Sequence, residues 1–196
     1  MDQYNLVMVG LGGQGVMTIS QILATAASKE GIPVRLFEAT GLTQRGGSVQ
    51  GHLRLGESYS PKIPLGNAQG LICLELSEIA RGSTHYLAKN GKVWINTAKI
   101  YDHHTKLRPD LYPSIEKLKA LVNLRTDRIY MIPADSLAQD AGSAQAVNMV
   151  MIGAFATSEP ILKTDSIVQA IQEKSERFAP INIDAFWKGY NFIKRQ

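Results

Sequence analysis

The chain has 196 residues, of which 44% are hydrophobic and 19% are charged, a balance typical of a folded globular domain and not of a disordered chain. The formal net charge is +4, and the Lys and Arg residues are spread along the sequence without a dense run, which argues against a nucleic-acid surface because such a surface clusters its basic residues. The only cysteine, Cys73, excludes an internal disulfide and a cysteine-held metal or iron–sulfur cluster.

The amino-terminal quarter predicts a strand, a helix and two further strands. Residues 4–9 are short and apolar and end at a glycine cluster, which is typical of a buried strand. Apolar side chains then recur at helical spacing over residues 18–28. Residues 34–37 and 49–55 are the next two expected strands. The connection between these two is too short for the crossover helix of a parallel pair, so the second half of a dinucleotide-binding fold is missing.

The middle of the chain continues the alternation of strands and helices. The fourth expected strand, residues 71–76, is almost continuously apolar, which is typical of a strand in a sheet that is covered on both faces. The pair Asn90-Gly91 predicts a turn before the fifth strand, and Pro133 closes the sixth. The segments expected here are, in order, strand 71–76, helix 77–87, strand 92–95, a polar connecting loop 97–113 and strand 129–132.

The carboxyl-terminal part is expected to be helical, with helices over residues 144–156, 164–174 and 183–193. We therefore predict one α/β domain over residues 1–196, with a helical tail over about 160–196. Its sheet is mixed but mostly parallel, flanked by helices, with a Rossmann-like first βαβ unit. The chain starts without the basic and apolar regions of a secretory signal, and no apolar run is long enough to span a membrane, so we expect a cytoplasmic protein.

A glycine turn follows the first strand and precedes the first helix, which is the context of the G-x-G-x-x-G motif. Glu38 ends the second strand, about where a dinucleotide fold places its ribose-binding acid, so one hypothesis is a free-standing oxidoreductase that binds NAD or FAD. We prefer the interpretation that the glycines permit close helix–sheet packing and an interface turn. The turn residues considered for backbone or phosphate approach are Gly10, Gly12, Gly13, Gln14 and Gly15.

A second glycine-rich segment lies between the second and third strands, and it contains Thr43, Gln44, Arg45, Gly46, Gly47 and Ser48. Together with the first turn, it resembles the gamma subunits of 2-oxoacid:ferredoxin oxidoreductases, most closely the indolepyruvate and keto-acid small subunits. The resemblance continues through His52-Leu53-Arg54 and Ser60-Pro61-Lys62-Ile63-Pro64, and it covers most of residues 5–160. Each motif alone has modest specificity for this family, but the two glycine segments together are a specific signal.

The resemblance implies a subunit of an enzyme that decarboxylates a 2-oxoacid oxidatively on thiamine diphosphate and passes the electrons through iron–sulfur clusters to a ferredoxin-type acceptor. The thiamine diphosphate, Mg²⁺ and clusters are then held by partner subunits, and this chain has no catalytic or metal-binding residue and is inactive alone. Residues 43–48 would face the thiamine-binding alpha and beta subunits, with Gln44 and Arg45 donating hydrogen bonds. Arg45 could instead satisfy carbonyl groups of its own loop.

Two further implications concern ligands and assembly. In members that use coenzyme A, a phosphate of that molecule could contact the first glycine turn or Arg45. An isolated chain could also form a homodimer. A third hypothesis, from a different class, is an interaction module without any role in an enzyme.

The remaining polar and aromatic candidates have mostly structural interpretations. His103 and His104 are expected in a solvated loop, because adjacent histidines point apart and lack a third ligand. His52 has either a structural role or a carboxylate partner at an interface. Glu75 and Glu78 are expected to cap helix amides and not to form an acid–base pair. The aromatic residues near the carboxyl terminus are expected to pack on the core, with an assembly surface as the second choice; they are Phe186, Trp187, Tyr190 and Phe192.

Overall fold

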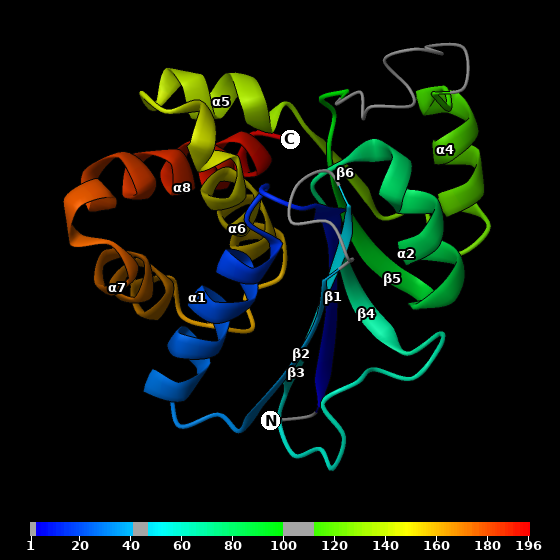
Figure 1. The fold of residues 1–196 in the computed structure, drawn as a ribbon, viewed down its shortest axis with the longest axis horizontal. Helices are drawn as coiled ribbons and strands as arrows, with labels where there is room; N and C mark the ends of the chain where they lie inside the picture. The colour runs from blue at the N-terminus through cyan, green and yellow to red at the C-terminus, as the bar shows by residue number, and fades with distance from the viewer. Residues whose placement is uncertain (1–2, 41–46, 100–111) are drawn as a thin grey trace.

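Six strands form one sheet with the spatial order β2-β3-β1-β4-β5-β6 (Figure 1). The computed structural model describes residues 3–40, 47–99 and 112–196. The strands are β1 (Tyr4–Leu11), β2 (Val34–Thr40), β3 (Ser48–Leu55), β4 (Ala68–Cys73), β5 (Leu87–Asn96) and β6 (Ile129–Ile132). All six expected strands are therefore present, and the expected α/β class with a mixed, mostly parallel sheet is confirmed.

The short connection between β2 and β3 determines the one reversal in the sheet. Strand β3 runs antiparallel to both β1 and β2, and the pairs β1–β4, β4–β5 and β5–β6 are parallel. Strands β1 and β2 therefore run in the same direction with helix α1 between them in sequence, but β3 separates them in space. The first βαβ unit is present in this split form, and a second such unit is not formed by β2 and β3.

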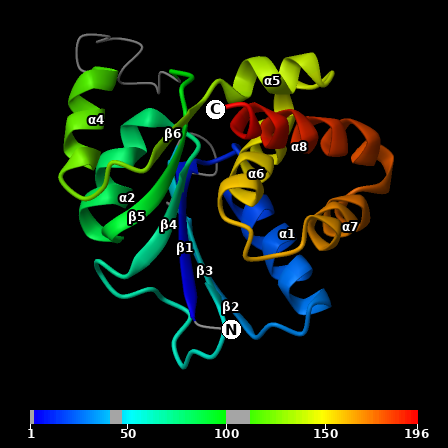
Figure 2. The ribbon, with the colours of Figure 1, turned by 180° about the vertical axis from the view of Figure 1, so that it is seen from behind.

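Helices cover both faces of the sheet, as the two opposite views show (Figures 1 and 2). One face carries α1 (Val16–Lys29), α5 (Ala134–Asp140), α6 (Val147–Ser158), α7 (Thr164–Lys174) and α8 (Ala179–Lys194), and the other carries α2 (Ile79–His85) and α4 (Ile115–Asn123). Alternate side chains of β1 enter the two cores: Leu6 and Met8 enter the larger one, and Val7 and Val9 the smaller. This two-sided burial explains why the central strands are continuously apolar.

Helix α6 is apolar on all sides and is enclosed by its neighbours, chiefly by α8. The two helices touch through glycines, since a Cβ at Gly153 would lie 2.0 Å from the Phe186 carbonyl oxygen, and one at Gly189 would lie 2.0 Å from that of Val150. Phe186 is fully buried in the larger core, as expected, while Trp187 is 37% exposed. The carboxyl-terminal helices thus form part of the main core.

Three local predictions in the middle of the chain were wrong. Strand β5 begins at Leu87, so the preceding helix ends at His85 and the pair Asn90-Gly91 lies inside a strand. Asn90 has φ of 63°, and between the pairs Ala68–Leu87 and Gly70–Lys92 strand β5 has three more residues than β4, so an irregularity within the strand replaces the predicted turn. Strand β4 ends at Cys73, and a 3₁₀ helix follows over Leu76–Glu78.

Helix α4 was not predicted, although Ser114 provides a local signal: its side chain accepts a hydrogen bond from the Lys117 amide at the helix start. Most of the expected loop 97–113, including His103 and His104, lies outside the described residues. Within the described ranges, no helix combines the length and the apolar character required to cross a membrane.

Candidate functional site

The two glycine segments meet at the carboxyl-terminal edge of the parallel strands. The Gly12 amide donates a 2.8 Å hydrogen bond to the Gly47 carbonyl, which joins the turn after β1 to the end of the connection between β2 and β3. Gly47 and Ser48 are the described members of the second segment, and the other four predicted residues, Thr43, Gln44, Arg45 and Gly46, lie outside the described part of the chain. Ligands of α/β sheets commonly bind at this edge, so we take it as the candidate site.

The first glycine turn is closed by its own hydrogen bonds. The Gln14 side chain folds back, and its Oε1 accepts from the Leu11 amide at 2.6 Å, while the Gln14 amide donates to the Leu11 carbonyl at 3.1 Å. Gly13 and Gly15 have φ angles of 96° and 84°, which residues other than glycine rarely adopt. Gly15 precedes α1 at its N-cap position and cannot cap the helix with a side chain. The first amides of α1 therefore remain available.

A cavity of about 510 Å³ opens beside this turn, between the amino-terminal ends of α1 and α6. Helix α6 continues directly from a 3₁₀ turn over Ala144–Ala146, which Ser143 caps by accepting from the Gln145 amide. Asn148, in its first turn, is 8% exposed, and its Oδ1 accepts from the Met149 amide, while its Nδ2 makes no hydrogen bond to any described residue. The lining residues are Gly13, Gln14, Gly15, Thr18, Asn96, Asp135, Ala144, Gln145, Val147 and Asn148. The uncapped start of α1 and the Nδ2 of Asn148 give the cavity donors for an anion.

Asn96 fixes the wall of the cavity opposite the turn. Its Nδ2 donates to the Leu74 carbonyl at 3.2 Å and to Asp135 Oδ2 at 2.7 Å, and its Oδ1 accepts from the amides of Ala98 and Ala134, each at 3.3 Å. This one side chain ties the ends of β4 and β5 to the start of α5. Neither Asp135 nor Asn148 was singled out from the sequence, because no local pattern places them beside a turn so far away in the chain.

Glu38, the expected ribose-binding acid of a dinucleotide site, does not lie beside the glycine turn. Glu38 Oε1 accepts a 2.7 Å hydrogen bond from the hydroxyl group of Ser20 on α1. Strand β3 also lies between β2 and β1, so the end of β2 is not adjacent to the glycine turn, as it is in a dinucleotide fold. The geometry therefore does not favour the NAD or FAD hypothesis.

Glu75 and Glu78 have different roles at the start of α2. Glu75 is fully buried and caps the 3₁₀ helix by accepting from the Ser77 amide at 2.7 Å, and it also accepts from the hydroxyl groups of Ser77 and Tyr112. Glu78 makes no side-chain cap, so that prediction was wrong. Its Oε2 instead accepts from the Ser48 hydroxyl group at 2.6 Å.

His52 has a structural role, which is the first of the two interpretations given for it. It is fully buried between the rings of Phe37 and Tyr86, and its Nδ1 accepts from the Ile63 amide at 3.0 Å. Burial lowers the pKa of His52 to about 4, and the cations of Lys62 and Arg54 add to this effect. The imidazole is therefore neutral near pH 7.

The cysteine and the acidic residues form no metal site in the described chain. Cys73 is fully buried, its Sγ contacts the Glu75 carbonyl at 2.8 Å, and burial raises the pKa of its thiol well above the ordinary value. Across residues 3–40, 47–99 and 112–196, no three His, Cys, Asp or Glu side chains gather as metal ligands do.

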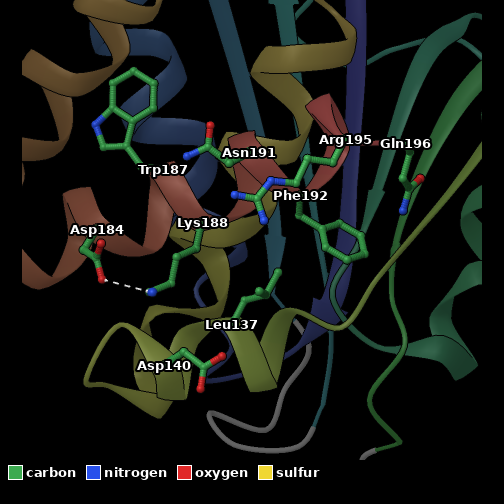
Figure 3. Close-up of a pocket in the computed structure, with 9 residues that line it drawn as sticks. All are labelled: Leu137, Asp140, Asp184, Trp187, Lys188, Asn191, Phe192, Arg195 and Gln196. Atoms are coloured by element: carbon green, nitrogen blue, oxygen red, sulfur yellow. Dashed lines mark ion pairs between the residues drawn. The ribbon is translucent and has the colours of Figure 1, made fainter.

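Another cavity, of about 610 Å³, lies away from both glycine segments. Side chains of α5 and α8 face one another across it, and Lys188 pairs with Asp184 at 3.7 Å on its rim (Figure 3). Its lining mixes acids, bases and aromatic rings and contains no residue of the glycine turn. We therefore place the candidate site at the smaller cavity, where the uncapped start of α1 meets the Nδ2 of Asn148.

Comparisons with known proteins agree on one family. The sequence profile of the pyruvate ferredoxin/flavodoxin oxidoreductase family matches residues 5–192. Indolepyruvate oxidoreductase subunit IorB of Archaeoglobus fulgidus is 35% identical over 189 residues, which cover 95% of this chain and 94% of that protein. Subunit PORC of the pyruvate oxidoreductase of Thermotoga maritima has the same fold, with a TM-score of 0.74, 20% identity and coverage of 97% of each chain.

A larger enzyme contains the same fold as one part. The 2-oxoglutarate:ferredoxin oxidoreductase of Magnetococcus marinus, solved with 2-oxoglutarate, coenzyme A and succinyl-CoA bound, superposes with a TM-score of 0.72 at 15% identity. The superposition covers all of this chain and 32% of the longer one.

Proposed function

The chain belongs to the pyruvate ferredoxin/flavodoxin oxidoreductase family, and from this membership we infer that it is the gamma-type subunit of a heteromeric 2-oxoacid oxidoreductase. The observation that carries the inference is the 35% identity to an indolepyruvate oxidoreductase subunit over nearly the full length of both chains. We propose an aryl-pyruvate as the 2-oxoacid on the same basis. The enzyme as a whole removes carbon dioxide from the 2-oxoacid and passes two electrons to a ferredoxin-type acceptor.

The proposal assigns the redox chemistry to the partner subunits. The described residues provide no cluster of metal ligands and one buried cysteine, so they do not fit Mg²⁺ or an iron–sulfur cluster. Thiamine diphosphate, Mg²⁺ and the clusters therefore belong to the thiamine-binding subunits. This chain contributes the joined glycine segments at the carboxyl-terminal edge of its sheet, where the backbone can approach a partner closely.

Reconstitution tests this division of labour. The purified chain alone should not reduce a ferredoxin or a viologen dye with any aryl-pyruvate. Addition of the thiamine-binding, cluster-bearing partner should restore turnover in proportion to the amount of complex formed. A partner that is fully active without this chain, or micromolar binding of NAD or FAD to the isolated chain, would refute the proposal.

A second proposal concerns the cavity beside the first glycine turn, which fits a phosphate of coenzyme A as the acyl acceptor. The support is the donor set: the uncapped start of α1 and the free Nδ2 of the buried Asn148. Gly15 keeps this cradle open, since a Cβ there would lie 2.4 Å from Asn148 Nδ2. When bound, coenzyme A supplies the thiol that takes the acyl group, and residues of this chain hold and orient it.

Substitution of Asn148 tests the second proposal. Asn148→Ala removes one donor to a charged group, so we expect the affinity of the chain for coenzyme A to fall about tenfold in calorimetric titration. In the reconstituted enzyme the KM for coenzyme A should rise by a similar factor, while the KM for the 2-oxoacid should not change. Asn191→Ala, an exposed change on α8 outside this cavity, is the matched control. Equal titration curves for the two variants would contradict this site.

A further inference from the structure

The last two residues of the β2–β3 connection are anchored on both sides. Gly47 accepts from the Gly12 amide in the first glycine turn. Ser48 donates from its hydroxyl group to Glu78 Oε2 at 2.6 Å, and the same hydroxyl oxygen accepts from Arg81 Nη1 at 3.2 Å. The second glycine segment therefore joins β3 at a point fixed by both β1 and α2.

Glu78 is well placed to hold this point rigidly. Its side chain is only 11% exposed, and Arg81 Nε lies 3.8 Å from Glu78 Oε2, while the Arg81 side chain is 59% exposed. The 3₁₀ helix that carries Glu78 is itself fixed by the buried cap Glu75. A nearly buried carboxylate that accepts from a hydroxyl group and faces a guanidinium makes a strong, directional contact.

We propose that Glu78 is a positioning residue for subunit docking, acting through Ser48 to hold the end of the glycine-rich connection in its docking position. The inference rests on the proposed function, in which this edge meets the thiamine-binding subunits. A surface that is ordered before its partner arrives loses less conformational entropy on binding. Loss of the contact between Ser48 and Glu78 therefore weakens the complex more than it weakens the fold.

A double-mutant cycle tests the role of this contact. The thiamine-binding partner is titrated with wild-type chain and with Ser48→Ala, Glu78→Ala and the double variant, and the half-saturating concentration for turnover is measured. Each single change should raise this concentration about fivefold, a loss of about 1 kcal/mol. The double change should also give about fivefold, because both remove the same contact. The thermal midpoint of each isolated variant should stay within about 2 °C of wild type.

Glu57→Ala is the matched control, since Glu57 is exposed in the loop that follows β3 at the opposite edge of the sheet. It should leave the half-saturating concentration within about twofold of wild type. Unchanged affinity in both single variants, or independent effects that multiply to about 25-fold in the double variant, would overturn this inference alone. A wild-type chain that never restores turnover would overturn the proposed function and this inference with it.

Discussion

Gly15 satisfies two requirements that no other residue type meets together. Its φ of 84° lies in the left-handed region, where a side chain is strained, and a Cβ would collide with Asn148. The first requirement is local, and the glycine motif predicts it. The second depends on a helix far along the chain, and it is what brings the starts of α1 and α6 to one cavity.

His52 shows the same division between local pattern and tertiary environment. Its place in an alternating strand predicts the direction that it shares with Arg54. Its neutrality near pH 7 follows from burial between the Phe37 and Tyr86 rings, to which the cations of Lys62 and Arg54 add, and in this state its Nδ1 accepts from the Ile63 amide. Protonation at Nδ1 would break that hydrogen bond inside the core.

The lowered pKa of His52 makes the protein less stable in acid. Its pKa is about 4 when folded and about 6.5 when unfolded, so the unfolded chain binds the proton more readily. The resulting stability is fully present above pH 6.5 and is lost as the pH falls from 6.5 toward 4. We expect the free energy of unfolding to fall by about 2–3 kcal/mol over this range from this residue.

Urea unfolding of wild type and His52→Gln at pH 7.5, 6 and 5 measures this contribution, because other titrating groups are common to both chains. The variant should be less stable at pH 7.5, where the Ile63 amide loses its acceptor, and the gap should narrow at pH 5. A constant gap across the three pH values would show that His52 does not titrate as described.

At the scale of elements, the pair α6 and α8 is held by close backbone approach. A Cβ at either Gly153 or Gly189 would lie 2.0 Å from a carbonyl oxygen of the other helix. These oxygens belong to regular helix backbone and cannot move alone, so any larger residue must separate the helices. The apolar sequence of α6 predicts a buried helix but not which helix covers it.

Gly153→Ala should therefore be strongly destabilising, although alanine favours helices. We expect a loss of about 3 kcal/mol or more in the free energy of unfolding, measured by denaturant titration. Gly82→Ala in α2 is the matched comparison, because its Cβ would meet Leu71 methyl groups at 2.8 and 3.0 Å, which are side-chain atoms that can shift. A loss for Gly153→Ala no larger than for Gly82→Ala would contradict this view of the helix crossing.

At the scale of the whole molecule, the sheet separates two cores and gathers the functional segments at one edge. The larger core lies under α1 and α5–α8, and the smaller lies under α2 and α4. The first glycine turn lies at the end of β1, the second glycine segment ends where β3 begins, and Asn96 is the last residue of β5. All three lie at the carboxyl-terminal edge of the parallel strands. Because parallel strands end on the same side, this gathering is a consequence of topology.

Features that arise within a short window of the chain could be predicted from the residues alone. Apolar periodicity located α7 over its full length and β6 over all of its residues, and the glycine motif located the turn before α1. The short connection after β2 excluded a second βαβ unit. The pair Asn90-Gly91 predicts a turn but lies in an irregular part of β5, because residues that tolerate a positive φ suit both.

Which of these elements are neighbours depends on the packing of the whole chain. The insertion of β3 between β1 and β2, the hydrogen bond from Gly12 to Gly47, and the free amide of Asn148 beside Gly15 all join residues distant in sequence. Local propensity does not predict such contacts, because they depend on the simultaneous burial of whole strand and helix faces. The glycine turn could therefore be predicted from the sequence, but the cavity that it helps to form could not.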